Sequence, residues 1–145
     1  MFKTILLPTD GSVISNAMMR RCIEMAKETG AKVVGLHVIP DFHVFAYQPE
    51  MVIDTREQYK LDSEAHARNF LADITLAAQE AGVPCETLFV QDNEPYEAIV
   101  KVAKEKGCDL ICMASHGRKG VKGLLLGSET QKVLTHSQIP VLVFR

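Results

Sequence analysis

The residues best suited to chemistry in this sequence lie in one stretch, MASHGRKGVKGLLLGSET, which runs from Met113 to Thr130. It contains four glycines, one histidine and three basic side chains. Glycines let backbone N–H groups approach an anion closely, and the first amides of a helix have no partner within that helix. Gly127 followed by Ser128, at the expected start of a helix, therefore predicts a phosphate-binding site.

Several of these residues also have a plainer interpretation. Ser128 and Gln131 have the spacing of a capping box, which occurs in helices that bind no ligand. Arg118, Lys119 and Lys122 would raise the electrostatic potential toward a polyphosphate, but charged residues on an exposed loop are usually only solvated. The phosphate hypothesis therefore depends on the loop as a whole rather than on one side chain.

A second polar turn, PTDGS, follows the first apolar run and contains Asp10. Its carboxylate could bind a metal carried by a phosphate, a ribose hydroxyl, or the backbone of its own turn. His116 is suited to acid–base chemistry, but no nucleophile with a third orienting group is apparent around it. We assign no catalytic residue, and we expect His37 and Met113 to be core or pocket-wall residues.

Alternating apolar and amphipathic segments position these turns. Short β-rich runs predict five strands, and periodic segments with capping residues and terminal glycines predict four helices. The mixed, aromatic segment 41–54 is expected to be a loop. The strands are expected at residues 4–8, 31–40, 85–91, 109–115 and 139–144, and the helices at 12–30, 55–82, 92–107 and 128–137.

The order of these elements predicts where a ligand binds. Strands separated by helices form a parallel sheet with right-handed crossovers, because they cannot pair as hairpins. Ligands of such sheets bind at the carboxyl ends of the strands, near the point where the strand order reverses. The first and fourth strands end in PTDGS and ASHGRKG, so we expect one site lined by both turns.

Length and composition fit one domain, residues 1–145. The net charge is −2, with both signs scattered along the chain, which argues against nucleic acid as a partner.

The first apolar run is too short for a secretory signal, and no run reaches the ~20 residues of a membrane helix. We therefore expect a soluble, cytoplasmic protein. The four cysteines have neither zinc-site nor disulfide-framework spacing.

The last apolar run, PVLVF, lies at the end of the chain. A strand that is apolar on both faces would invite pairing with another molecule if it were left bare at a sheet edge. We therefore expect this strand to be buried in a homodimer.

Five motifs together resemble the universal stress proteins, specifically the single-domain type that binds ATP: PTDGS, LHV, MASHGR, LLLGS and IPVLVF. The resemblance extends from Phe2 to Arg145. It implies an α/β fold in which four helices flank a five-stranded parallel sheet, doubly wound and Rossmann-like, with strand order 3-2-1-4-5. It also implies a homodimer that forms through the C-terminal strand. The cofactor that it implies is ATP, with or without Mg²⁺.

The ATP signature of that family is a glycine, two residues, a second glycine, nine residues, and then glycine with serine or threonine. Gly117, Gly127 and Ser128 match it, whereas Ala114 replaces the first glycine and its methyl group could crowd the ligand. Glu129 would place a carboxylate close to the phosphates, where a neutral residue is more favourable. The resemblance implies adenine near Val38 and the Pro8, Thr9 and Asp10 turn, ribose near Met113 and Ala114, and phosphates on Gly117, Gly127, Ser128 and the amide of Glu129. The Mg²⁺ of a bound nucleotide is the metal that Asp10 could contact from its position in the turn.

Three functions are consistent with these features. The first is a stress-response regulator in which ATP occupancy changes a surface that an unidentified protein partner reads. The second is an enzyme that slowly hydrolyses ATP or transfers its nucleotidyl group, although the chain has no GxxxxGK[ST] loop, so we expect at most a weak ATPase. The third is a nucleotide-free dimeric scaffold, as family members without the signature are taken to be.

Overall fold

The computed structural model describes residues 1–42, 49–116 and 126–145, with the backbone alone for 49–54. Five strands alternate with four helices, and the sheet order is β3-β2-β1-β4-β5 with parallel neighbours throughout. The predicted fold class and strand order are confirmed. The elements are β1 (Thr4–Pro8), α1 (Val13–Thr29), β2 (Lys32–Ile39), α2 (Pro49–Ala81), β3 (Cys85–Gln91), α3 (Pro95–Glu105), β4 (Leu110–Ala114), α4 (Ser128–His136) and β5 (Val141–Phe144).

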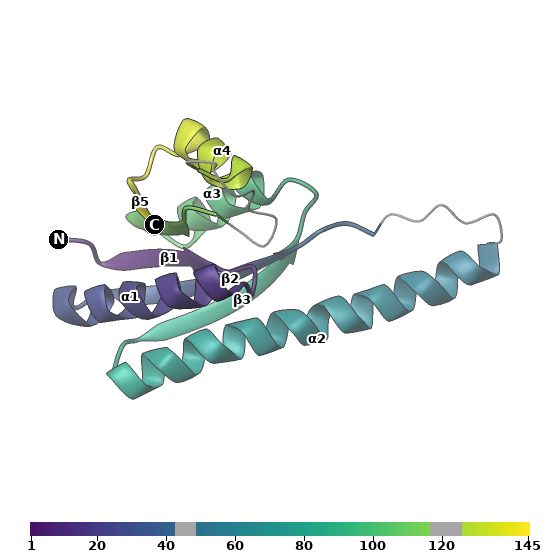
Figure 1. Ribbon diagram of the computed structural model, residues 1–145, viewed down its shortest axis with the longest axis horizontal. Helices are drawn as coiled ribbons and strands as arrows, with labels where there is room; N and C mark the ends of the chain where they lie inside the picture. The colour runs from purple at the N-terminus through teal and green to yellow at the C-terminus, as the bar shows by residue number, and fades with distance from the viewer. Residues whose placement is uncertain (43–48, 117–125) are drawn as a thin grey trace.

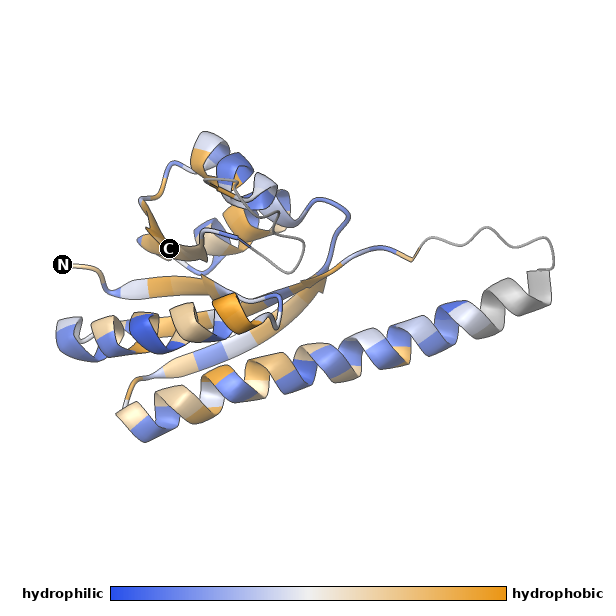
Figure 2. Ribbon diagram, viewed as in Figure 1, coloured by the Kyte–Doolittle hydropathy of each residue, from blue (hydrophilic) through white to orange (hydrophobic). Residues whose placement is uncertain are grey.

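Two helices cover each face of the sheet, with α1 and α2 on one face and α3 and α4 on the other (Figure 1). The side chains of β1 alternate between two hydrophobic clusters: Ile5 and Leu7 pack in the cluster beneath α1 and α2, and Leu6 packs in the cluster beneath α3. All three are fully buried. A central parallel strand must be hydrophobic on both faces, and Figure 2 shows hydrophobic colours along β1 beyond its start, whereas β3 also carries hydrophilic ones.

The second helix is longer than predicted. The sequence pattern assigns residues 41–54 to a loop, but α2 begins at Pro49 instead of Thr55. Proline suits the first position of a helix, because its φ is already helical and the N–H that it lacks would have no partner there. As a result α2 extends beyond the carboxyl ends of the strands (Figure 1). Residues 43–48 of the expected loop lie outside the described residues.

All four cysteines are free thiols, and Cys22, Cys108 and Cys112 are buried. Cys22 on α1 lies beside Cys112 on β4, and the hydrogen bond between these two side chains, together with burial, raises the pKa of Cys22. Burial also raises the pKa of Cys108, to about 11. The thiols of Cys22 and Cys108 are therefore neutral at pH 7, and the buried cysteines pack as small apolar side chains.

Asp109 connects the turn before β4 to the start of β1. Its carboxylate accepts hydrogen bonds from the backbone N–H of Lys3, at 2.9 and 3.1 Å, and of Thr4, at 3.0 Å. Partial burial opposes ionisation, but the backbone hydrogen bonds outweigh it and hold the pKa of Asp109 below its usual value. The ionised carboxylate therefore stabilises the edge-to-edge arrangement of β1 and β4.

Replacing Asp109 with asparagine should lower the free energy of unfolding by about 1 kcal/mol at neutral pH, because charge-assisted hydrogen bonds become neutral ones. The folded-state pKa is below the unfolded-state pKa, so this contribution is complete above about pH 4 and is lost as the pH falls toward the folded-state value. Urea unfolding of both proteins across this pH range should show a difference that shrinks in acid. A difference independent of pH would contradict the role given to the charge.

Candidate functional site

The site expected between PTDGS and ASHGRKG lies where the strand order reverses. β1 leads into α1 on one face of the sheet, and its neighbour β4 leads toward α4 on the other face (Figure 1). The register pairs Leu6 with Ile111, which brings the end of β1 at Pro8 level with Met113 in β4. Val38 lies near the end of β2, on the other side of β1. These residues therefore share one edge of the sheet, at the switch point.

The turn after β1 is held by its own side chains. Asp10 Oδ1 accepts the backbone N–H of Ser12 at 2.9 Å, and Thr9 Oγ1 accepts that of Gly11 at 3.1 Å. Ser12 caps α1 by accepting the backbone N–H of Ser15 at 3.1 Å, and the Ser15 hydroxyl donates to Thr9 Oγ1 at 3.1 Å. The backbone of its own turn, one of the three partners considered for Asp10, is therefore a partner of this carboxylate.

His37 also fixes this turn, a role that the sequence interpretation missed. His37 Nδ1 lies 2.8 Å from the carbonyl oxygen of Thr9, and because a carbonyl can only accept, Nδ1 bears the proton. The His37 ring packs edge-on against Phe70 of α2, with 5.1 Å between the ring centroids. Phe70 in turn lies against Gly11, where a Cβ would come within 2.4 Å of the Phe70 ring. The one sequence signal for this contact is the histidine of LHV, which lies near the end of a predicted strand.

The start of α4 is tied to the end of β4. The Thr130 hydroxyl donates to the carbonyl oxygen of Ala114 at 2.8 Å, and the backbone N–H of Gly127 donates to that of Ser115 at 2.6 Å. Both Thr130 and Ser115 are buried, and sequence reasoning assigned neither of them to the site. His116 Nδ1 lies 3.1 Å from Ser115 Oγ. The N-terminus of α4 is therefore held beside the switch point.

The predicted capping box at the start of α4 is wrong. Gly127 is the N-cap, with ψ of 155°, and Ser128 is already helical. Because the cap falls one residue earlier than predicted, the backbone N–H of Gln131 donates to the Gly127 carbonyl at 3.0 Å instead of to the Ser128 side chain. Within the described residues, the amides of Ser128 and Glu129 and the Ser128 hydroxyl have no hydrogen-bond partner. The helix therefore presents free donors, as an anion-binding N-terminus does.

The carboxylate of Glu129 is not directed at this N-terminus, contrary to the expectation from sequence. Glu129 Oε2 accepts the backbone N–H of Tyr96 at 3.0 Å, in the first turn of α3, and Oε1 lies 3.3 Å from Lys132 Nζ. The hydrogen bond with Glu129 raises the pKa of Lys132. Glu129 is thus paired with a cation and a helix N-terminus, which reduces its repulsion of a phosphate bound at the Glu129 amide.

The methyl group of Ala114, which departs from the family signature, packs against the hydrophobic cluster beneath α1 and α2. The remaining glycine of the signature, Gly117, lies outside the described residues, as do Arg118, Lys119 and Lys122. Across residues 1–42, 55–116 and 126–145, no group of three or more His, Cys, Asp or Glu side chains could hold a metal ion. A cation at this site would therefore depend on the ligand for most of its coordination.

Comparison with known proteins identifies the family. The family model described as "Universal stress protein family" matches residues 1–145. Universal stress protein YxiE of Bacillus subtilis is 34% identical over 152 residues, with all of both chains covered. Universal stress protein MJ0577 of Methanocaldococcus jannaschii is 30% identical over 156 residues, which cover 100% of this chain and 96% of the relative.

Solved structures show the same fold. The structure of MJ0577 aligns with a TM-score of 0.83 and 31% identity, covering 99% of this chain and 95% of that one. A universal stress protein in complex with cAMP aligns with a TM-score of 0.69 and 24% identity, covering 99% and 97%. One from Archaeoglobus fulgidus in complex with dAMP aligns with a TM-score of 0.66 and 18% identity, covering 100% and 98%.

Proposed function

This chain belongs to the universal stress protein family, and we propose that it binds an adenine nucleotide, ATP, at the switch point between β1 and β4. The observation that supports this proposal most directly is the N-terminus of α4, where the free amides of Ser128 and Glu129 are held beside the end of β4. Two structures of the same fold are complexes with adenine nucleotides, cAMP and dAMP. An anion at such a helix N-terminus is favoured by both free donors and the helix dipole.

In this proposal each part of the nucleotide contacts a different element at the switch point. The phosphates accept from the α4 amides, the ribose lies over the end of β4, and adenine lies between the ends of β1 and β2. Mg²⁺, when present, is bound mainly by phosphate and water, with Asp10 as the nearest carboxylate on the β1 turn. The proposed contacts are Pro8, Thr9, Asp10, Val38, Met113, Ala114, Gly117, Gly127, Ser128 and Glu129.

The proposed role is that of a dimeric stress-response regulator rather than an enzyme. β5 is an edge strand whose residues are all half-buried or exposed, with Leu142 36% exposed, so a second copy could cover it by strand pairing. A cytoplasmic location is part of the same proposal. Among the described residues, no helix combines the length and the hydropathy that crossing a bilayer requires.

The test is to denature freshly purified protein, identify any released nucleotide by chromatography, and titrate the stripped protein with ATP, with and without Mg²⁺, by calorimetry. Unchanged ATP and saturable binding support a regulator. ADP or AMP that accumulates with time supports slow turnover instead. The absence of both nucleotide and binding heat would contradict the proposal and favour the scaffold.

Replacing Ala114 with glycine should leave the affinity for ATP within about twofold of wild type, because the methyl group already packs in the core. The same change should lower the free energy of unfolding by about 1 kcal/mol, since glycine is more flexible in the unfolded chain. Calorimetry and urea unfolding measure the two effects separately. A large gain in affinity would mean that the methyl group obstructs the ligand after all.

A further inference from the structure

The outer edge of β3 has unused backbone hydrogen-bonding groups. Pro84 O accepts from Val33 N, and Asp92 N donates to Ile39 O, both at 2.9 Å, so the even-numbered residues between them direct their backbone groups toward β2. The backbone N–H and C=O of the odd-numbered residues, Thr87 among them, therefore point away from the sheet. No residue of β3, all of which the structure describes, is buried. The edge is available for one more strand.

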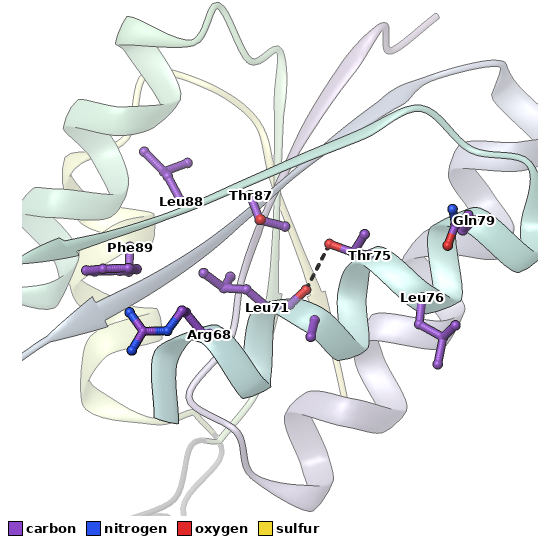
Figure 3. Close-up of a pocket in the computed structure, with 9 residues that line it drawn as sticks. Arg68, Leu71, Thr75, Leu76, Gln79, Thr87, Leu88 and Phe89 are labelled. Carbon is purple, nitrogen blue, oxygen red and sulfur yellow. Dashed lines mark hydrogen bonds between the residues drawn. The ribbon is translucent and has the colours of Figure 1, made fainter. Parts of the chain in front are cut away.

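A groove of about 610 Å³ lies beside this edge, between β3 and α2 (Figure 3). α2 covers the line between β2 and β3, since a Cβ at Gly35 of β2 would meet both Ile74 of α2, at 3.0 Å, and Thr87 of β3, at 3.1 Å. α2 therefore does not extend over the strip beyond β3. Leu71 and Leu76 on α2 line the apolar part of the groove, and Leu76 is 55% exposed.

The geometry specifies an extended occupant. A strand added to β3 would lie about 4.8 Å from it, and every second side chain would point to the face covered by α2. Those side chains would reach the groove beside Leu71 and Thr75 of α2. The Thr75 hydroxyl also lines the groove. It does not compete for the hydrogen bonds of the added strand, because it already donates to the Leu71 carbonyl at 3.1 Å. Main-chain bonds to a sheet edge, with pockets for alternate side chains, are a known mode of peptide recognition.

The positive charge of Arg68, at one end of the groove, favours an occupant that carries a carboxylate. Arg68 lies beneath Phe89, and its side chain is 60% exposed (Figure 3). Its ion pair with Glu64 has a length of 3.8 Å, which is too long for a hydrogen bond and weak at such exposure. A carboxylate in the groove could pair with this guanidinium through two hydrogen bonds, whereas a lysine would be repelled.

We propose that the edge of β3 and the outer side of α2 bind an extended segment of another protein that carries alternating apolar side chains and one carboxylate opposite Arg68. A second copy of this chain is the less favourable occupant. With β5 proposed as the dimer edge, self-pairing at β3 as well would join copies at both edges into an open filament. This inference concerns a surface separate from the nucleotide site and does not depend on nucleotide binding.

The test uses three capped heptapeptides, Thr-Val-Thr-Xaa-Thr-Val-Thr, in which Xaa is aspartate, alanine or lysine. The sequence reads the same in both directions, so it can add to β3 in either orientation. Each peptide is titrated into the ¹⁵N-labelled full-length protein, and amide shifts and hydrogen exchange are followed at Thr87 and Phe89. The aspartate peptide should protect both amides and bind about tenfold tighter than the lysine peptide.

Two variants with matched controls locate the interaction. Thr87→Pro removes an outward N–H, which an edge strand tolerates, and should weaken binding at least about tenfold, while Thr87→Val should bind like wild type. Arg68→Ala should bring the aspartate and lysine peptides within about twofold of each other, while Lys60→Ala, which changes a cation elsewhere on α2, should not. If Thr87→Pro does not fold, Thr75→Glu tests the same groove, because Thr75 lies on the side of α2 that faces β3, and it should abolish binding of the aspartate peptide.

Three results would overturn the proposal. The first is no change at Thr87 and Phe89 with any peptide at about 1 mM. The second is binding that is insensitive to the central residue and to Arg68→Ala. The third is a concentration-dependent self-association that protects these amides without peptide, which would identify a second copy as the occupant.

Discussion

Replacing Ser128 with proline should weaken ATP binding at least about tenfold and leave the fold intact. The Ser128 amide is one of the free donors at the N-terminus of α4, and proline has no N–H to donate. A hydrogen bond to a charged phosphate contributes about 1.5–3 kcal/mol, which corresponds to about tenfold or more in affinity. Calorimetric titration of the stripped proteins with ATP measures the loss directly.

The chain is suited to this substitution. Ser128 occupies the first helical position, where proline is favoured, and the preceding residue, Gly127, has φ of −67° and ψ of 155°, in the region that a residue before proline prefers. Ser128→Ala is the matched control, because it removes only the hydroxyl and keeps the N–H. If the proline and alanine variants bind ATP equally well, with unchanged unfolding temperatures, the phosphates do not bind at this helix.

The fold could be predicted from the sequence because its determinants are local. The strand expected at residues 85–91 has the observed bounds of β3, since the hydrophobic run ends at turn residues on both sides. The helix expected at residues 55–82 was placed too late, because a proline in the sequence is compatible with both a loop and a helix start. Element type thus follows from periodicity, whereas a boundary depends on which of two conformations the rest of the chain stabilises.

The candidate site was predicted less completely, because its side chains take partners that are distant in sequence. The charge of Glu129 was visible in the sequence, but its partner Tyr96 lies 33 residues away. The hydrogen bond from His37 to Thr9 likewise joins residues 28 positions apart. No spacing rule for a single helix or strand contains such pairs, so sequence reasoning located the site without assigning the groups that shape it.

Replacing Gly11 with alanine should lower the free energy of unfolding by about 2–4 kcal/mol, the largest stability effect expected from a single substitution here. Gly11 has φ of +78°, a conformation that alanine adopts at a cost, and the added Cβ would come within 2.4 Å of the Phe70 ring. The Phe70 ring cannot move freely, because it packs against His37 on β2. Urea unfolding monitored by circular dichroism measures the loss.

Gly82→Ala separates the two causes. Gly82 has nearly the same φ, +73°, but no atom lies within 4 Å of a Cβ built there, so this variant should lose only the conformational part, about 1 kcal/mol. The excess loss in Gly11→Ala then measures the contact between Phe70 and the turn after β1, and Phe70→Leu should reduce that excess when combined with Gly11→Ala.

Since this turn is the proposed adenine contact, Gly11→Ala should also weaken ATP binding while Gly82→Ala should not. Equal stability losses in the two alanine variants would mean that α2 does not hold the turn in place.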